Sequence, residues 1–558
     1  MMKHLPLFAL FIAVTVAGSL LVTGAAEAKP LNVLFIGIDD LRPQLRSYGY
    51  PQMKTPNFDR LATMGMQFDR AYVQQAVCSA SRASLLTGCR PDSTGVNYPY
   101  SPWFNTVFAE KYKPIAEHFA ENGFYTRTLG KIHHGPADQG LSEPHFSEPG
   151  PDFLLTENQH EGKRSGYIHL QKPWEHADLP DSAFIDGQIA DETVETIRRA
   201  VKKDKPFFIA PGFKKPHLPF VCPKRYYDLY SDEDIELPLH AVRGKDQPEY
   251  TISNQTGASK WWKYPDTGID KDNARQLIQS YYACVSFVDA QIGKILDELE
   301  AQELLDSTAI ITWSDHGWHL GDHGMWGKST NFEWATRVPL FVYVPGMKAA
   351  GTPTEALVEY VDLFPTALEI VGLPIPDYLE GTSFAPVLQD ASKPWKRAAF
   401  SQFPRSSKMS GHTEGLSIRT KEFRYTRWVG KDRGDVIFEE LYDERDNLLD
   451  ARNLAEDPEF KEVIDEHRKL SAEGWKGALP PGVVNQSNLP RGDDSWYYRS
   501  KKDQEAAAKK AKAEMPTKGI AQTSENKPWI KGFFEKNPSA DTNEDGILTS
   551  EELKRFKE

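Results

Sequence analysis

The chain has 558 residues, of which 40% are hydrophobic, and a formal net charge of −13 at pH 7. This length exceeds what one ordinary core accommodates, so we expect two packed layers or domains with appended segments. The acidic balance argues against a nucleic-acid-binding protein, and it means that any anion site on this chain must be local.

The N-terminus has the pattern of an export signal. Lys3 and His4 precede an apolar stretch at 5–22, and Ala-Glu-Ala at 26–28 provides a small-residue cleavage site. We therefore predict a signal peptide at residues 1–28 and an exported protein, periplasmic or secreted. The alternative is a membrane anchor, but the apolar stretch is short and interrupted by polar residues. No later stretch is long and apolar enough to span a bilayer, so no transmembrane anchor is expected.

Continuous apolar runs alternate along the chain with helical patterns. Such runs are typical of strands that are buried on both faces, as in parallel sheets. The apolar runs are 31–40, 124–130, 206–213, 308–317 and 338–346. The helical patterns are 113–122, 182–203, 272–304 and 361–371. Strands that alternate with helices predict an α/β sandwich around a central, mostly parallel sheet.

The pattern changes after residue 374. Residues 415–430 have the alternation of an antiparallel hairpin, and we assign 375–479 to a smaller C-terminal α+β subdomain. Residues 480–526 are predicted to form a polar linker and a charged helix, and 527–558 a last separate segment.

Two of the predicted strands end in groups that bind metal ions. Asp39 and Asp40 close the first run, and Asp315 and His316 close the fourth. Ligands of open α/β sheets bind beyond the carboxyl ends of the strands, so we expect these side chains to meet. Carboxylate oxygens favour Ca²⁺ or Mg²⁺, whereas one imidazole leaves the identity of the metal open. An Asp-Asp pair by itself more often belongs to a turn or a helix cap. The Asp315-His316 pair at the end of a second strand makes a metal site the favoured interpretation.

Basic side chains follow these and other strand ends. Lys131 and His134 follow the second run, Lys215 and His217 the third, and Lys328 the fourth. A lysine offers a compact positive charge to an anionic oxygen, and a histidine can hold an anion or transfer a proton. Each of them alone would be an ordinary surface residue, but their recurrence at successive strand ends predicts an anion-binding site.

A short motif between the first and second runs resembles the signature of the type I sulfatases. It reads Cys78-Ser79-Ala80-Ser81-Arg82, followed by Leu86-Thr87-Gly88. Further stretches in order are NVLFIGIDDLRPQLRSYG, GKIHHG, KPHLPF, SDHGWHLGDHGMWGKSTNFEWATRVPLFVYVPG, DLFPTALEIVGLP and SIRTKEFRYTRWVG. Together they are most similar to the iduronate-2-sulfatase branch, over residues 31–454. The resemblance implies an alkaline-phosphatase-like sandwich, with 29–374 as the catalytic domain and 375–479 as the C-terminal sulfatase subdomain.

The resemblance also implies a chemistry for Cys78. In that family a formylglycine-generating maturation enzyme oxidises the motif cysteine to formylglycine, whose hydrate is a gem-diol. One hydroxyl attacks the sulfur of a sulfate ester, and the other later expels sulfate from the covalent intermediate. A divalent cation, Ca²⁺ or alternatively Mg²⁺, lowers the pKa of the hydroxyl and neutralises the sulfuryl oxygens. The family's metal ligands match Asp39, Asp40, Cys78, Asp315 and His316.

The same resemblance assigns roles to other side chains. Arg82 is expected to brace the gem-diol and the metal-binding carboxylates, and His134 to act as base on the second hydroxyl. The residues expected to hold the sulfate oxygens are Lys131, His217 and Lys328. Lys328 or His217 protonates the leaving oxygen, and the sequence does not choose between them. Trp318, beside the metal ligands, is expected to line the sugar subsite.

The motif departs from the commonest family form. Ala80 stands where proline is commonest, and some maturation systems are expected to accept alanine there. Cys89 stands where the family often has arginine, and we interpret it as a buried small hydrophobic residue. The small residues after Cys78 let a maturation enzyme bind the segment extended. The mature segment is then expected to form a helix over 81–87, whose N-terminus favours an anion.

The expected function is hydrolysis of a sulfate ester of a polysaccharide or oligosaccharide, as in glycosaminoglycan degradation. The branch suggests the 2-O-sulfate of a uronic acid. One alternative is a phosphodiesterase or phosphonate monoester hydrolase of the same superfamily, against which the long resemblance around 315–345 argues. Another is an exported, calcium-dependent binding protein without catalysis, which is disfavoured because all the expected catalytic residue types are present.

Residues 541–552 match the twelve-residue EF-hand calcium loop. The oxygens of positions one, three, five, seven, nine and twelve come from Asp541, Asn543, Asp545, the backbone of Ile547, Thr549 and Glu552. Gly546 permits the sharp turn that this loop requires. We predict a second Ca²⁺ site in the EF-hand-like segment 527–558; the alternative is a solvated acidic loop.

Overall fold

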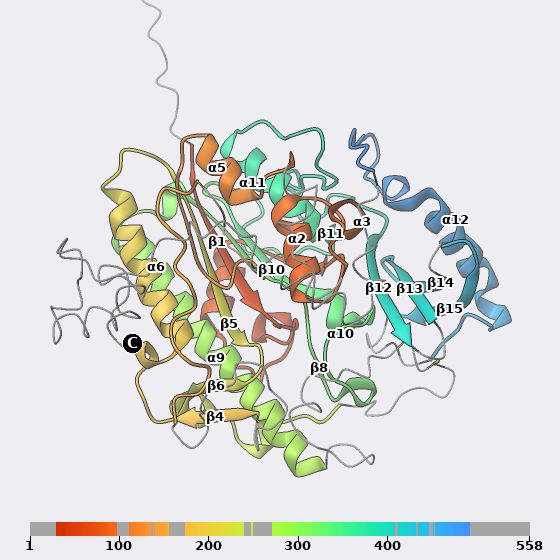
Figure 1. Cartoon of the computed structure of the whole chain (residues 1–558), viewed down its shortest axis with the longest axis horizontal. Helices are drawn as coiled ribbons and strands as arrows, with labels where there is room; N and C mark the ends of the chain where they lie inside the picture. The colour runs from red at the N-terminus through yellow and green to blue at the C-terminus, as the bar shows by residue number, and fades with distance from the viewer. Residues whose placement is uncertain are drawn as a thin grey trace, which may run out of the picture.

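The structure is a computed structural model, drawn in Figure 1. It describes residues 30–97, 111–134, 138, 140–155, 173–238, 247–248, 251, 270–407, 411–430, 433–445, 450 and 452–490. The predicted signal peptide, charged helix and EF-hand-like segment lie outside the described residues. Within them, no helix is long and apolar enough to cross a membrane.

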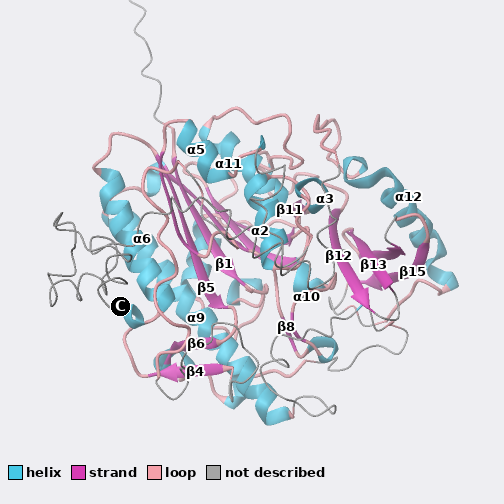
Figure 2. Cartoon of the chain, viewed as in Figure 1, coloured by secondary structure: helices cyan, strands magenta, loops and turns pink. Residues whose placement is uncertain are grey.

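A seven-stranded sheet forms the centre of the molecule (Figure 2). The strands, in spatial order, are β11 (Val358–Glu359), β2 (Met66–Tyr72), β10 (Arg337–Tyr343), β7 (Thr308–Ser314), β1 (Asn32–Asp39), β5 (Phe207–Pro216) and β3 (Tyr125–Gly130). β1 is parallel to β5 and β7, and β5 is parallel to β3, whereas β10 is antiparallel to β7 and β2. The predicted α/β architecture is confirmed, but the run at 338–346 is an antiparallel strand and the sheet is therefore mixed.

Strand β1 shows how an apolar run builds two cores. Successive side chains of a strand point to opposite faces. Leu34, Ile36 and Ile38 belong to one hydrophobic core, and Val33 and Phe35 to the other. Helices α1 (Pro56–Met64), α6 (Ile185–Val201) and α9 (Lys271–Ala301) contribute to the first core. Helices α2 (Cys78–Thr87), α5 (Ile115–Glu121) and α11 (Leu363–Val371) contribute to the second, so the sheet is covered on both faces (Figure 1).

A second sheet lies beside the main one (Figure 2). Its antiparallel strands, in order, are β12 (Ala399–Ser407), β13 (Gly411–Arg419), β14 (Phe423–Gly430) and β15 (Val436–Asp443). Helix α12 (Lys461–Gly477) packs on this sheet through Ile464 and Leu470. The antiparallel hairpin predicted at 415–430 is confirmed by β13 and β14.

Shorter strands and α-helices lie between these elements. They are α3 (Pro91–Thr94), β4 (Trp174–Ala177), β6 (Phe220–Pro223), α7 (Lys224–Tyr227), β8 (His319–Leu320), β9 (Trp326–Gly327) and α10 (Glu333–Thr336). β4 pairs with β6 and β8 with β9.

Buried contacts join the second sheet to the elements around the main one. The carboxylate of Glu333 in α10 forms ion pairs with Arg419 of β13, at 3.0 Å, and with Arg424 of β14. Phe403 of β12 packs in one cluster with Ala80 of α2. The C-terminal sheet therefore supports the helix that begins at Cys78.

Candidate active site

The carboxyl ends of β1 and β7 bring the predicted metal ligands together. The strands pair in parallel with Ile38 opposite Ser314, so the chain leaves both at the same edge of the sheet. Asp39 and Asp40 on one side, and Asp315 and His316 on the other, are all fully buried. The Asp40 backbone N–H donates to Asp315 Oδ1 at 3.1 Å.

The backbone turns sharply at Asp40, which has a φ of 64°. This left-handed conformation is uncommon outside glycine, and surrounding contacts must hold it. The Tyr281 hydroxyl of α9 donates to the Asp40 carbonyl at 2.7 Å and accepts from the Arg42 N–H at 3.0 Å. The Leu41 N–H donates to Ser314 Oγ at 3.0 Å. Sequence reasoning missed Tyr281, because nothing marks one tyrosine within a long buried helix.

Cys78 is the first residue of α2, and every residue of this helix is buried. The helix begins at Cys78 rather than at Ser81, so the prediction of a helix over 81–87 was too short at its N-terminus. The small side chains allow close packing: Ser81 Oγ donates to the carbonyl of Asp315. The thiol consequently lies at the positive end of a helix dipole, beside the ends of β1 and β7.

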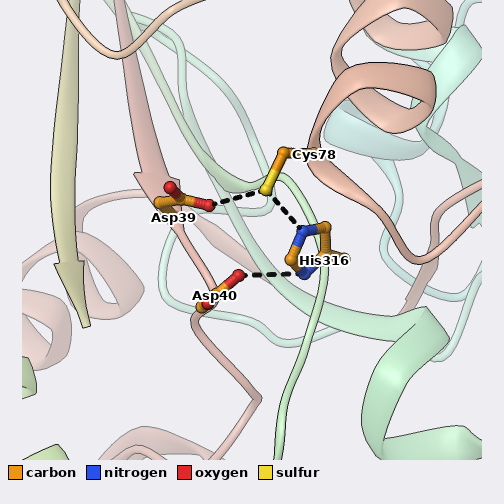
Figure 3. Close-up of side chains that lie close together, drawn as sticks. All are labelled: Asp39, Asp40, Cys78 and His316. Carbon is orange, nitrogen blue, oxygen red and sulfur yellow. Dashed lines mark hydrogen bonds and ion pairs between the residues drawn. The ribbon is translucent and has the colours of Figure 1, made fainter. Parts of the chain in front are cut away.

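The Cys78 sulfur lies among the predicted metal ligands (Figure 3). Its Sγ is 3.3 Å from His316 Nε2 and 3.5 Å from Asp39 Oδ1. His316 Nδ1 is in turn 3.3 Å from Asp40 Oδ1. One potential ligand atom from each of these four residues lies within 4.8 Å of all the others. The structure therefore brings together side chains that are up to 277 positions apart, counting from Asp39 to His316.

Two lysines reach the same sulfur. Lys328, after β9, places Nζ 3.0 Å from Cys78 Sγ and forms an ion pair with Asp40. Lys131, directly after β3, places Nζ 4.0 Å from Sγ and forms an ion pair with Asp39. Burial opposes ionisation of the thiol, but Lys131, Lys328 and the ring of His316 together hold the pKa of Cys78 well below its usual range.

Arg82, one helical turn after Cys78, is 1% exposed and braces the strand ends. Its Nε lies 2.8 Å from Asp315 Oδ2, and its Nη2 lies 3.7 Å from Asp39 Oδ1. Its Nη1 donates to the carbonyls of Lys131 and, at 3.0 Å, of Ile132. One guanidinium thus ties the ends of β1, β3 and β7 to α2, as its rigid fork of donors permits.

Two histidines complete the set that the sequence pointed to. His217, just after β5, has Nε2 4.0 Å from Asp40 Oδ2, and its ring is 23% exposed. His134 follows β3 closely, and its side chain is among the groups that lower the pKa of the Cys78 thiol. Both imidazoles therefore lie where a group attached at Cys78 would be within reach.

Trp318 is 3% exposed and belongs to the first hydrophobic core. The Lys328 Nζ lies 5.6 Å from the centroid of its ring, within the range of a cation–π contact. Its expected role in a sugar subsite stays a prediction; the contact shown is to the lysine beside Cys78.

The donor set suits a divalent cation. Asp40 Oδ2 is buried and has no hydrogen-bond partner, which is costly unless another group compensates for it. Burial and the Cys78 sulfur disfavour charge on Asp39, but Lys131, His217 and Arg82 hold the pKa of Asp39 well below its usual range. Burial raises the pKa of Asp315 to about 7 although Arg82 opposes it. The ligand atoms that cluster come from Asp39, Asp40, Cys78 and His316. Asp315 lies outside this cluster: its Oδ2 is 3.6 Å from His316 Nε2 and pairs with Arg82, so its place as a further ligand stays a prediction. Carboxylate oxygens with one imidazole fit Ca²⁺ or Mg²⁺ once Cys78 is converted to an oxygen-bearing residue.

Comparison with known proteins identifies the class. The sequence model of the family described as "Sulfatase" matches residues 31–373, and that described as "N-sulphoglucosamine sulphohydrolase, C-terminal" matches residues 321–473. The chain is 34% identical to iduronate 2-sulfatase of Mus musculus over 491 residues, covering 74% of this chain and 87% of that protein. The chain belongs to the sulfatase family. It is an enzyme that hydrolyses sulfate esters, and the iduronate 2-sulfatases are among its relatives.

Solved structures share the fold. One is a protein solved in complex with its substrate, D-glucosamine-2-N,6-O-disulfate. Its structure matches this one with a TM-score of 0.64 and 23% sequence identity, over 81% of this chain and 98% of that one. Another is a phosphonate monoester hydrolase of Agrobacterium radiobacter, also with a TM-score of 0.64 and 23% identity, covering 79% and 95%. The predicted alkaline-phosphatase-like sulfatase fold is thereby confirmed. Equal likeness to both structures means that the fold itself does not distinguish sulfate esters from phosphonate esters.

Proposed function

We propose that this enzyme removes the 2-O-sulfate of a uronic acid in a sulfated glycan, using Cys78 converted to formylglycine and a divalent cation. The observation that carries the proposal is the convergence on one buried sulfur. Asp39, His316 and Lys328 all approach Cys78 Sγ within 3.5 Å. A thiol that served only as packing would not need acid, base and ammonium groups around it.

The Cys78 position fits the converted residue. Formylglycine, as its hydrate, would supply a hydroxyl nucleophile there, and the cation would supply Lewis-acid stabilisation of negative oxygens. The chain's own contribution is placement: α2 delivers residue 78 to the ends of β1 and β7, and Arg82 fixes the carboxylates on either side. Asp39, Asp40, Asp315 and His316 would hold the cation together with residue 78.

The lysines and histidines around residue 78 would bind the sulfate. Lys131 and Lys328 approach the sulfur from two strand ends, so an anionic oxygen near it would contact two ammonium groups. Both are desolvated, which strengthens their attraction for an anion. His134, whose side chain acts on the pKa of Cys78, would take a proton from the converted residue. His217 or Lys328 would give a proton to the leaving sugar oxygen.

The substrate proposal is supported by the relatives. The match to iduronate 2-sulfatase covers 87% of that protein and extends well beyond the residues of the active site. The shared fold keeps phosphonate monoesters as the second candidate substrate class. The predicted maturation enzyme and export are part of this proposal, because the glycan would be met outside the cytoplasm.

A substrate panel tests the proposal. The full-length protein, produced together with a formylglycine-generating enzyme, is given a disaccharide with a 2-O-sulfated uronate, a 6-O-sulfated hexosamine and a phenylphosphonate monoester. We expect the kcat/KM for the uronate sulfate to exceed those for the others by roughly 100-fold. Cys78→Ala should release no sulfate, and the mass of the Cys78 peptide should show the aldehyde in place of the thiol. Faster turnover of the phosphonate ester, or an unconverted Cys78 in active enzyme, would contradict the proposal.

A further inference from the structure

Lys215 belongs to the basic residues at the strand ends, yet its ammonium does not reach the cluster around Cys78. The residue is 3% exposed. Its Nζ donates to the carbonyl of His217 at 2.8 Å and to the carbonyl of Pro219 at 2.6 Å. Both bonds lie within the loop that follows β5. Burying an ammonium group costs free energy unless the group is hydrogen-bonded. The Lys215 ammonium is hydrogen-bonded to two backbone carbonyls, one on each side of Leu218.

The strand end from which Lys215 projects is itself anchored. Asp186, in the first turn of α6, is 1% exposed. Its Oδ1 accepts the N–H of Lys214 at 2.8 Å, and its Oδ2 accepts the N–H of Lys215 at 2.7 Å. The carboxylate therefore holds the backbone, while the Lys215 side chain holds the loop beyond it.

The held loop determines where the His217 ring points. His217 Nδ1 lies 2.5 Å from the carbonyl of Leu218, so Nδ1 carries the proton that it donates there. The opposite nitrogen, Nε2, is thereby directed to the site and lies 4.0 Å from Asp40 Oδ2. Asp186, Lys215 and the loop carbonyls form a continuous chain of contacts from α6 to this imidazole.

We propose that Lys215 is a positioning residue that acts through His217: its buried ammonium fixes the loop so that Nε2 of His217 faces the reacting group at residue 78. The inference rests on the proposed function through the role given there to His217. Lys215 itself touches neither the sulfur of Cys78 nor the carboxylates around it through any described contact. Burial lowers the pKa of Lys215, in keeping with a side chain kept for a structural contact rather than for an anion.

A double-mutant cycle on the matured full-length enzyme tests this. Lys215→Met keeps the length and removes the ammonium, and we expect kcat for an aryl sulfate to fall about 10- to 100-fold with KM changed less than about threefold. His217→Ala should lower kcat by about 100-fold or more. In the His217→Ala background, Lys215→Met should change kcat by less than about threefold, because the group that it positions is gone. Lys214→Met is the matched control: that ammonium binds Glu148 and Asp152 instead, and kcat should stay within about threefold of wild type.

The outcomes separate this inference from the proposed function. If His217→Ala impairs turnover but Lys215→Met does not, or if the two losses multiply, Lys215 does not act through His217 and the inference fails alone. If His217→Ala leaves turnover unchanged, the role of His217 fails and this inference with it. Asp186→Asn weakens the contact between α6 and the backbone of Lys215, and it provides a second test of the inference in case Lys215→Met folds poorly. It should reproduce the kcat loss and the non-additivity, and additive losses there would overturn the inference too.

Discussion

The guanidinium Nε of Arg82 and the Asp315 Oδ2 lie 2.8 Å apart, with side chains that are 1% and 0% exposed. This pair joins the helix that carries Cys78 to the end of β7. Because other donors of the same guanidinium reach Asp39 and the carbonyls after β3, the geometry of the whole site depends on the shape of one side chain. A lysine at this position would keep the positive charge but lose the several planar N–H donors of the guanidinium.

Arg82→Lys is therefore expected to lower kcat/KM for an aryl sulfate about 100-fold. The ammonium can satisfy one of the partners of Arg82 but leaves the others buried and unpaired. Steady-state kinetics on the matured enzyme measures the effect. Arg60→Lys is the matched control. Arg60 forms exposed ion pairs with Asp297 and Glu300, and its replacement should leave kcat/KM unchanged. Near wild-type kcat/KM in Arg82→Lys would show that the brace is dispensable.

The buried Oδ2 of Asp40, which accepts no hydrogen bond, leads to a prediction about metal binding. Chelation should lower the melting temperature of the wild type, and added Ca²⁺ should restore it, because a cation that binds only the folded state stabilises that state. Asp40→Asn removes one charged ligand and should show a smaller chelation-dependent shift. Thermal unfolding with and without chelator measures both. Equal shifts in the two proteins would place the stabilising ion elsewhere.

Glu359 gives a prediction for acid stability. Burial disfavours its charge, but Arg90 and Lys396, at 2.7 and 2.8 Å, lower its pKa from 4.5 to about 2. The folded-state pKa is the lower one, so the stabilisation is complete above about pH 4.5 and is lost as the pH falls toward 2.

Glu359→Gln should therefore lower the free energy of unfolding at pH 7 by about 3 kcal/mol. Between pH 4.5 and 2, the stability of this variant should fall less steeply than that of the wild type. Urea unfolding at a series of pH values measures it. Glu300→Gln, on the exposed pair with Arg60, should keep the wild-type slope. If the free energy of unfolding of Glu359→Gln fell between pH 4.5 and 2 as steeply as that of the wild type, Glu359 would not be the group that causes the fall.

The strands that carry the site were predictable because they are buried on both faces. β1 leaves a continuous apolar run, and its last residue is the first carboxylate of the site. β2 was missed because Gln67, Asp69 and Arg70 interrupt its apolar pattern, and two of its positions are only half-buried. The apolar pattern identifies the strands that are buried along their whole length, the edge strand β3 included, and fails where polar, half-buried positions interrupt it.

Residue types at the strand ends, together with the resemblance to the sulfatases, predicted which side chains gather at Cys78, but not what holds them. Tyr281 supports Asp40 from 241 positions away, and such a contact leaves no mark in a single sequence. Lys215 was grouped with the anion-binding residues, since a lysine beside a histidine looks the same whether it faces a ligand or its own backbone. Only the placement of its Nζ against two carbonyls distinguishes the two.

The EF-hand-like segment, outside the described residues, carries the last prediction. Its oxygen donors occupy every ligand position of a calcium loop, including the bidentate position at Glu552. We propose that it binds Ca²⁺ independently of the active site. Deleting residues 516–558 should leave kcat for an aryl sulfate within about twofold of wild type while removing one bound Ca²⁺ per chain, because no residue assigned to the site lies in it. Metal analysis after gel filtration gives the stoichiometry, and Glu552→Gln is the point-variant control, expected to weaken that one site. Loss of turnover on deletion would show that the segment supports the catalytic body, and an unchanged Ca²⁺ content would show that the loop is only a solvated acidic turn.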